Sequence, residues 1–90
     1  MFLHLGQDTI ITTDEIVGIF DIDTTTVSKA TRTYLSSKEK NGDVINVSYE
    51  LPKSFIVTFD KDKREKKVYI SPISSVTLLK RIENAGYLKE

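Results

Sequence analysis

The segment Phe55-Ile56-Val57-Thr58-Phe59 is the part of the sequence that most constrains the fold. Apart from Thr58, its residues are apolar at both odd and even positions, and all of them are β-branched or aromatic. A strand that buries only one face alternates apolar and polar residues, so this segment predicts a central strand covered on both sides. The rest of the chain therefore has to cover two faces of one sheet.

Further short strands are predicted on both sides of this segment. Before it, β-branched and aromatic runs are separated by short polar breaks and indicate a meander of three strands: Phe2-Leu5, Thr9-Thr13 and Ile16-Phe20. A later alternation places Ile45, Val47, Tyr49 and Leu51 on one face of a strand that Pro52 ends, because proline has no N–H for pairing. Residues 60–67 are interpreted as a solvated hairpin connection, with a returning strand over Val68-Ile70.

Two amphipathic helices complete the expected set of elements. The first runs from about 24 to 40, with N-cap oxygens from Thr24, Thr25 and Thr26 and a stop at Asn41-Gly42. The second begins at Ser74 or Ser75, ends at Asn84-Ala85-Gly86, and buries Val76, Leu78, Leu79, Ile82 and Ala85. The order βββαβββα predicts an α+β fold, with a largely antiparallel sheet of about six short strands and two helices.

Length and residue usage limit the class of protein. Ninety residues predict a single small domain over 1–90, in which 83–90 form a flexible tail. The chain has no cysteine, which excludes thiolate metal sites, and it lacks a signal peptide and an apolar run of membrane length. We expect a cytoplasmic protein with no cofactor and no membrane partner.

The balance of charge bears directly on nucleic-acid binding. Thirteen Lys+Arg against 13 Asp+Glu give a net charge of zero, whereas proteins that neutralise phosphates usually carry a basic excess. Such a role would need local charge separation, or repetition of the cations in an oligomer. The candidate phosphate-binding residues are Lys53, Arg81, Lys61, Lys63, Arg64, Lys66 and Lys67. The last five are interleaved with Asp60, Asp62 and Glu65, so five positive against three negative charges leave a local excess of two, which a merely solvated hairpin also explains.

A short acidic motif raises the alternative of an enzyme. Asp21-Ile22-Asp23-Thr24-Thr25 follows an apolar strand and resembles the first motif of the haloacid-dehalogenase phosphatases, in which the first aspartate attacks a phosphoryl group. That family needs a doubly wound sheet, for which 90 residues with three strands before or at the motif leave no room. We therefore expect Asp21 and Asp23 to turn the chain and cap the following helix, and we expect no enzymatic activity.

Four stretches read together resemble one family, the small bacterial extracellular-matrix regulators, specifically the RemB-like branch related to RemA. They are His4-Leu5-Gly6, Asp14 to Asp21, Pro52-Lys53-Ser54, and Tyr69 to Arg81 with the sequence Tyr-Ile-Ser-Pro-Ile-Ser-Ser-Val-Thr-Leu-Leu-Lys-Arg. They occur in the family's order and span residues 1 to about 82.

The resemblance implies a cytoplasmic regulator of biofilm-matrix gene expression in bacteria. By similarity to the RemA branch, it also implies a protomer that assembles into a homo-oligomeric ring and meets DNA phosphates through basic loop residues. The RemA branch places arginines at the start of the third strand and in the loop before the central strand. Here those places hold Glu15 and Leu51-Pro52, and Lys53 is the nearest cation.

Two functional hypotheses follow from these observations. The first is a non-catalytic, self-associating regulator that contacts DNA phosphates nonspecifically through the seven candidate cations. The second is a protein-interaction module that binds a partner regulator and not DNA. Charge reversal at Lys53 and Arg81 separates them, because only the first hypothesis predicts a loss of function.

Overall fold

Strand β5 (Ser54–Asp60) lies inside a four-stranded sheet with the order β3-β5-β6-β4. The structure is a computed structural model that describes residues 1–22 and 29–89. β5 pairs antiparallel with β3 (Ile16–Asp21) and β6 (Glu65–Ser71), while β4 (Val44–Asn46) pairs parallel with β6. The first five residues of β5 are all buried, which confirms the predicted central strand.

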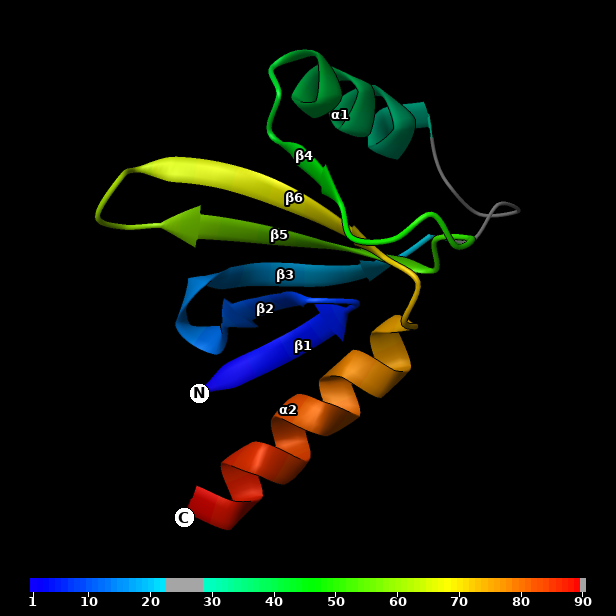
Figure 1. Cartoon of the computed structure of the whole chain (residues 1–90). Coiled ribbons are helices and arrows are strands. Elements are labelled where there is room, and N and C mark those ends of the chain that lie inside the picture. The colour runs from blue at the N-terminus through cyan, green and yellow to red at the C-terminus, as the bar shows by residue number, and fades with distance from the viewer. Residues whose placement is uncertain (23–28, 90) are drawn as a thin grey trace.

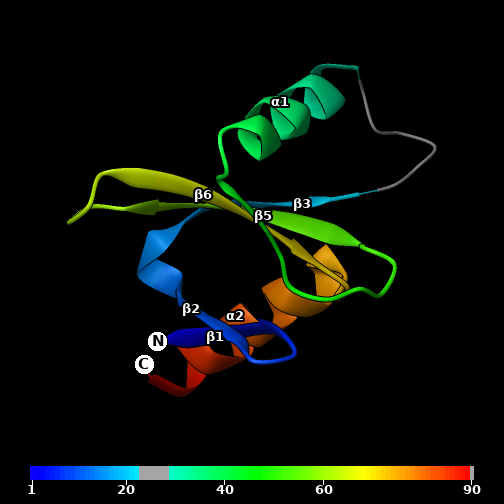
Figure 2. The ribbon, with the colours of Figure 1, turned by 45° about the horizontal axis from the view of Figure 1, so that its top comes forward.

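Different elements cover the two faces of this sheet (Figures 1 and 2). Helix α1 (Lys29–Lys40) lies over one face, and the hairpin of β1 (Phe2–Gly6) and β2 (Thr9–Thr12) lies over the other together with α2 (Ser75–Lys89). A 3-10 turn, Thr13–Glu15, connects β2 to β3. The element order confirms the predicted α+β fold with mostly antiparallel strands, which are divided between a two-stranded and a four-stranded sheet.

Each face of the four-stranded sheet has its own apolar cluster. The side chains on β5 alternate between them, because successive residues of a strand point to opposite faces. Towards β1, β2 and α2 the buried residues are Leu3, Leu5, Ile11, Val47, Ile56 and Leu78. Towards α1 they are Phe55, Val57 and Val68, with Tyr34, Leu35, Ile22, Val44 and Ile70 packed around them. The sheet is thus the shared wall of two cores.

The predicted three-strand meander is wrong, because β3 does not pair with β2. The turn at Thr13–Glu15 redirects the chain, and β3 pairs with β5 instead, from Ile16 opposite Thr58 to Asp21 opposite Ser54. A buried central strand needs a partner on each edge for its N–H and C=O groups, and β3 and β6 supply both.

The predicted strand from 45 to 51 is also too long, since β4 ends at Asn46. Asn46 lies opposite Ile70, one residue before β6 ends at Ser71. Beyond that point β4 has no strand to pair with, because Pro72 follows and the chain turns into α2. The alternating residues Tyr49 and Leu51 are accordingly exposed on a loop.

The predicted connection over 60–67 contains two different structures. Only Lys61 to Arg64 form the turn, and Glu65, Lys66 and Lys67 belong to β6. The Asp60 carboxylate accepts hydrogen bonds from the backbone N–H of Asp62 at 2.9 Å and of Lys63 at 3.1 Å, which closes the turn locally. The strand continues past the last apolar residue because its backbone still pairs with β5 up to Asp60 opposite Glu65.

The helices differ from prediction at their ends and on one face. The predicted caps of the first helix lie outside the described residues, whereas Ser74 Oγ accepts a hydrogen bond from the Thr77 N–H at 3.2 Å and caps α2. In α2, Leu78 is buried as predicted, but Val76 and Leu79 are exposed, because only one side of the helix contacts β1 and β3. α2 also runs through Gly86 to Lys89, so Gly86 does not end it and the predicted tail is helical to residue 89. A glycine inside a helix costs only about 1 kcal/mol.

Candidate nucleic-acid interface

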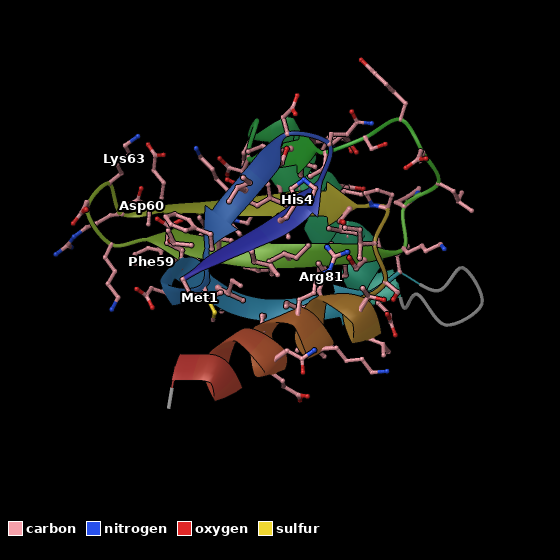
Figure 3. The ribbon with its side chains drawn as sticks, turned by 60° about the horizontal axis from the view of Figure 1, so that its bottom comes forward. Met1, His4, Phe59, Asp60, Lys63 and Arg81 are labelled. Atoms are coloured by element: carbon pink, nitrogen blue, oxygen red, sulfur yellow. The ribbon has the colours of Figure 1, made fainter. Side chains whose placement is uncertain are left out.

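The five hairpin cations gather at one end of the β5–β6 ribbon. Lys61, Lys63 and Arg64 lie in the exposed turn, while Lys66 and Lys67 are on β6, opposite Phe59 and Thr58 respectively. Figure 3 shows Lys63 at the far end of this hairpin, with Asp60 and Phe59 at its base. Adjacent residues of a strand point to opposite faces, so Lys66 and Lys67 do not face the same side of the sheet.

Lys53 lies at the opposite end of β5 and is exposed. Its backbone N–H donates to the Ser71 carbonyl at 2.9 Å, and its carbonyl accepts from the Ile22 N–H at 2.9 Å. These two bonds hold its position between the ends of β3 and β6. The seven residues of β5 span about 20 Å, so Lys53 and the hairpin cations do not form one patch in a protomer.

Arg81 occupies a third location, on the exposed surface of α2. Its Nη1 donates to the backbone carbonyl of His4 at 3.3 Å and links α2 to β1 (Figure 3). The guanidinium keeps further N–H donors that this bond does not use. The seven predicted cations therefore occupy three separate places, and a continuous basic surface would require more than one copy of the chain.

An acidic pocket lies beside the hairpin cations, and the sequence patterns did not predict it. It has a volume of about 450 Å³ and is lined by Thr12, Asp14, Glu15, Phe59, Asp60, Lys61 and Asp62. Four carboxylates against one ammonium give this pocket a negative potential that would repel phosphate. One acidic pair is Asp14 and Glu15, and the other is Asp60 and Asp62. The two pairs are more than 40 positions apart in sequence, and the contact of the 3-10 turn with β5 brings them together.

Asp21, the first aspartate of the predicted phosphatase-like motif, has a structural partner. The Asp21 carboxylate accepts a hydrogen bond from the Ser75 hydroxyl, which ties the end of β3 to the first residue of α2. Asp23, its companion in the predicted motif, lies outside the described residues. Among the residues that the structure describes, no group of three or more His, Asp or Glu side chains could hold a metal ion.

Among the residues that the structure describes, Tyr69, on β6, has the titratable group whose pKa departs most clearly from its ordinary value. Partial burial raises the pKa of the Tyr69 hydroxyl, and the negative charge of Glu15 raises it further. An unfolded tyrosine ionises near pH 10, so the folded chain holds this proton more tightly than the unfolded chain does. The stabilisation is complete below about pH 10 and is lost as the pH rises towards the higher pKa of the folded state.

We predict that Glu15→Gln lowers the pKa of Tyr69 but leaves it above the ordinary value, because burial is the larger cause. Absorbance of tyrosinate during alkaline titration measures this pKa, and Tyr69→Phe identifies its contribution among the four tyrosines. A titration of Tyr69 that does not change in Glu15→Gln would show that the carboxylate does not act on the hydroxyl.

Among the side chains that the structure describes, the most exposed large apolar ones are Tyr49 and Leu51, in loop 47–53, which joins β4 to β5. The Ser48 hydroxyl accepts from the Glu50 N–H at 3.0 Å and shapes the loop, while Tyr49 is fully exposed and Leu51 is 79% exposed. The sequence pattern placed both residues in a strand, because they continue the apolar alternation that begins in β4. That strand ends at Asn46, near the end of its partner β6.

Known proteins resemble this chain over most of its length. The family described as RemA-like, extracellular matrix regulatory protein A-like, matches residues 2–82. A relative from Bacillus subtilis (strain 168), "Extracellular matrix regulatory protein B", is 39% identical over 83 residues, which are 92% of this chain and 91% of the relative. Within the described residues, no helix is both long and apolar enough to cross a membrane.

Proposed function

The chain belongs to the RemA-like family of extracellular matrix regulatory proteins, and on this basis we propose that it is a non-catalytic regulator of matrix and biofilm gene expression in the bacterial cytoplasm. The match over residues 2–82 is the observation that carries the proposal. In the proposed mode of action, copies of the chain self-associate, in a ring, and contact DNA phosphates without reading the base sequence. The contacts come from Lys53, Arg81 and the hairpin cations.

Self-association reconciles a neutral protomer with phosphate binding. Each protomer contributes one copy of Lys53, Arg81 and the hairpin, and symmetry repeats every cation by the number of subunits. The carboxylates are repeated equally, so the net charge of the oligomer stays at zero. Phosphate binding then requires that cations and carboxylates lie on different parts of the surface. The hairpin offers partial separation, because the Asp60 carboxylate accepts two hydrogen bonds within the turn, while Lys61, Lys63 and Arg64 are exposed.

We predict a steep dependence of DNA affinity on salt. Each neutralised phosphate contributes about 0.9 to the slope of log affinity against log salt concentration, so binding of a fluorescent duplex should weaken sharply between about 50 and 200 mM salt. Lys53→Glu should reduce both affinity and slope, whereas Lys40→Glu, the same charge change at the end of α1, should change them much less. Absence of binding at about 50 mM salt would refute the DNA contact.

A protein-interaction module is the second candidate, and one observation favours it. Where the RemA branch has arginines, loop 47–53 presents Leu51 and Pro52, and Tyr49 beside them is fully exposed. Exposed apolar side chains favour protein contacts over phosphate contacts. This candidate predicts that matrix gene expression is unchanged in a strain carrying Lys53→Glu and Arg81→Glu.

A further inference from the structure

Loop 47–53 presents two apolar side chains that are not covered by the described residues. Tyr49 and Leu51 are 108% and 79% exposed, so the tyrosine ring is open to solvent on both of its faces. Glu50, which lies between them in sequence, is also exposed. Its negative charge disfavours a phosphate at this position, whereas an uncharged aromatic group can stack on the tyrosine ring. The exposed part of the loop is therefore suited to a flat, neutral ligand.

The backbone of this loop is held by β6 at both of its ends. The Val47 N–H donates to the Ile70 carbonyl at 3.0 Å, and the Lys53 N–H donates to the Ser71 carbonyl at 2.9 Å. A backbone that is already fixed loses less conformational entropy when a side chain on it binds a ligand. Tyr49 is thus an exposed ring on a loop whose ends are fixed.

Hydrogen bonds connect this loop with a second candidate cation. Lys53 belongs to the loop itself, and Arg81 is linked to it through the β1–β2 hairpin. Gln7 Nε2 donates to the Ser48 hydroxyl at 3.5 Å. The Gln7 carbonyl accepts from His4 Nε2 at 2.5 Å, and the His4 carbonyl accepts from Arg81 Nη1 at 3.3 Å (Figure 3). Two of the proposed phosphate contacts are therefore linked to the loop that carries the exposed ring.

A nucleobase fits these observations better than a protein partner does. Protein interfaces have an apolar core and bury about 800 Å² of each partner. In this loop the apolar pair is interrupted by Glu50 and followed by Lys53, so it offers room for one aromatic ring rather than an apolar core. Every base has an aromatic face, and its stacking on an exposed tyrosine needs no basic net charge and no particular base sequence. This chemistry agrees with a chain whose net charge is zero.

We infer that loop 47–53 binds an unpaired base of DNA, with Tyr49 stacked on the base, Leu51 against the same nucleotide and Lys53 on a neighbouring phosphate. In a fully paired duplex the faces of the bases are covered by their neighbours, and a base has to leave the stack before a side chain can stack on it. DNA that contains an unpaired base is therefore the preferred ligand. The inference rests on the DNA contact in the proposed function and names the form of DNA that the loop selects.

Two fluorescent duplexes of the same sequence test the inference, one fully paired and one with a single bulged adenine. Fluorescence anisotropy at about 50 mM salt should show that the wild-type chain binds the bulged duplex at least about fivefold more tightly, as expected for one stacked base. Tyr49→Ala should abolish this preference, whereas Tyr49→Phe, which keeps the ring, should retain it. Tyr49→Ala should also leave the salt dependence of binding unchanged, because stacking releases no counterions.

Phe2→Ala is the matched control, because it truncates another exposed aromatic side chain, on β1, and should retain the preference. Circular dichroism verifies that each variant is folded. Equal affinity of the wild-type chain for the two duplexes would overturn the inference and leave the proposed DNA contact in place. A preference that persists in Tyr49→Ala would also overturn it, and a loss of matrix gene expression in that variant would then assign the loop to a protein partner. Absence of binding to both duplexes would overturn the inference together with the proposed DNA contact.

Discussion

Leu78→Ala is expected to lower the free energy of unfolding by about 2 to 5 kcal/mol. The Leu78 side chain is fully buried in the cluster that contains Leu5 and Ile56, and it attaches α2 to the rest of the molecule. A domain of this size has a total stability of about 5 to 15 kcal/mol, so the loss is a large part of it. Urea unfolding followed by circular dichroism measures the change.

Leu79→Ala is the matched control, because it removes the same atoms from the next residue of the same helix. Leu79 is 46% exposed, and its truncation should cost less than about 1 kcal/mol in the protomer. Equal losses at the two positions would contradict the orientation of α2. Since sequence patterning placed both leucines on the buried side, this pair also measures what the tertiary structure adds.

Ser71→Ala is expected to destabilise the fold by about 1 to 3 kcal/mol, although it removes one oxygen atom. The buried Ser71 hydroxyl donates to the Leu5 carbonyl at 2.5 Å and accepts from the Ile73 N–H at 3.0 Å. Its loss leaves both backbone groups without this partner and removes the hydrogen bond that links β1 to the end of β6. Thermal unfolding of the variant measures the effect.

Ser36→Ala provides the comparison for Ser71→Ala, because Ser36 is exposed on α1 and alanine is a better helix former. We expect no loss of stability there. If the two serine variants unfold at the same temperature, the hydrogen bonds of Ser71 do not hold β1 against the four-stranded sheet.

Local patterns were sufficient where the sequence itself carries the signal. The apolar segment Phe55-Phe59 marks a strand buried on both faces, and Ser74 begins a helix, because a hydroxyl can accept from an N–H three residues later. The family resemblance, built on four stretches of residues, is confirmed by the match over residues 2–82. The role of the seven candidate cations in DNA contact remains a prediction.

Local sequence patterns did not predict which strands pair or which residues far apart in sequence come into contact. Alternation continues through Tyr49 and Leu51, but a strand needs a second strand beside it, and β6 ends first. Likewise, periodicity marks an apolar side of α2 wide enough to include Leu79, while the contacts with β1 and β3 bury only part of that side. Both differences arise because burial depends on the neighbouring element as well as on the residue.

The sequence by itself determined the class of fold, the order of its elements and the family, because these depend on local propensity, apolar spacing and residue identity. The tertiary structure alone decided which strands pair, and it placed Asp14 and Glu15 beside Asp60 and Asp62 in one pocket. It also set Lys53 and the hairpin cations at opposite ends of β5. Electrostatic and packing interactions depend on distance in space. Residues that are far apart in the chain come close to one another only when the chain folds.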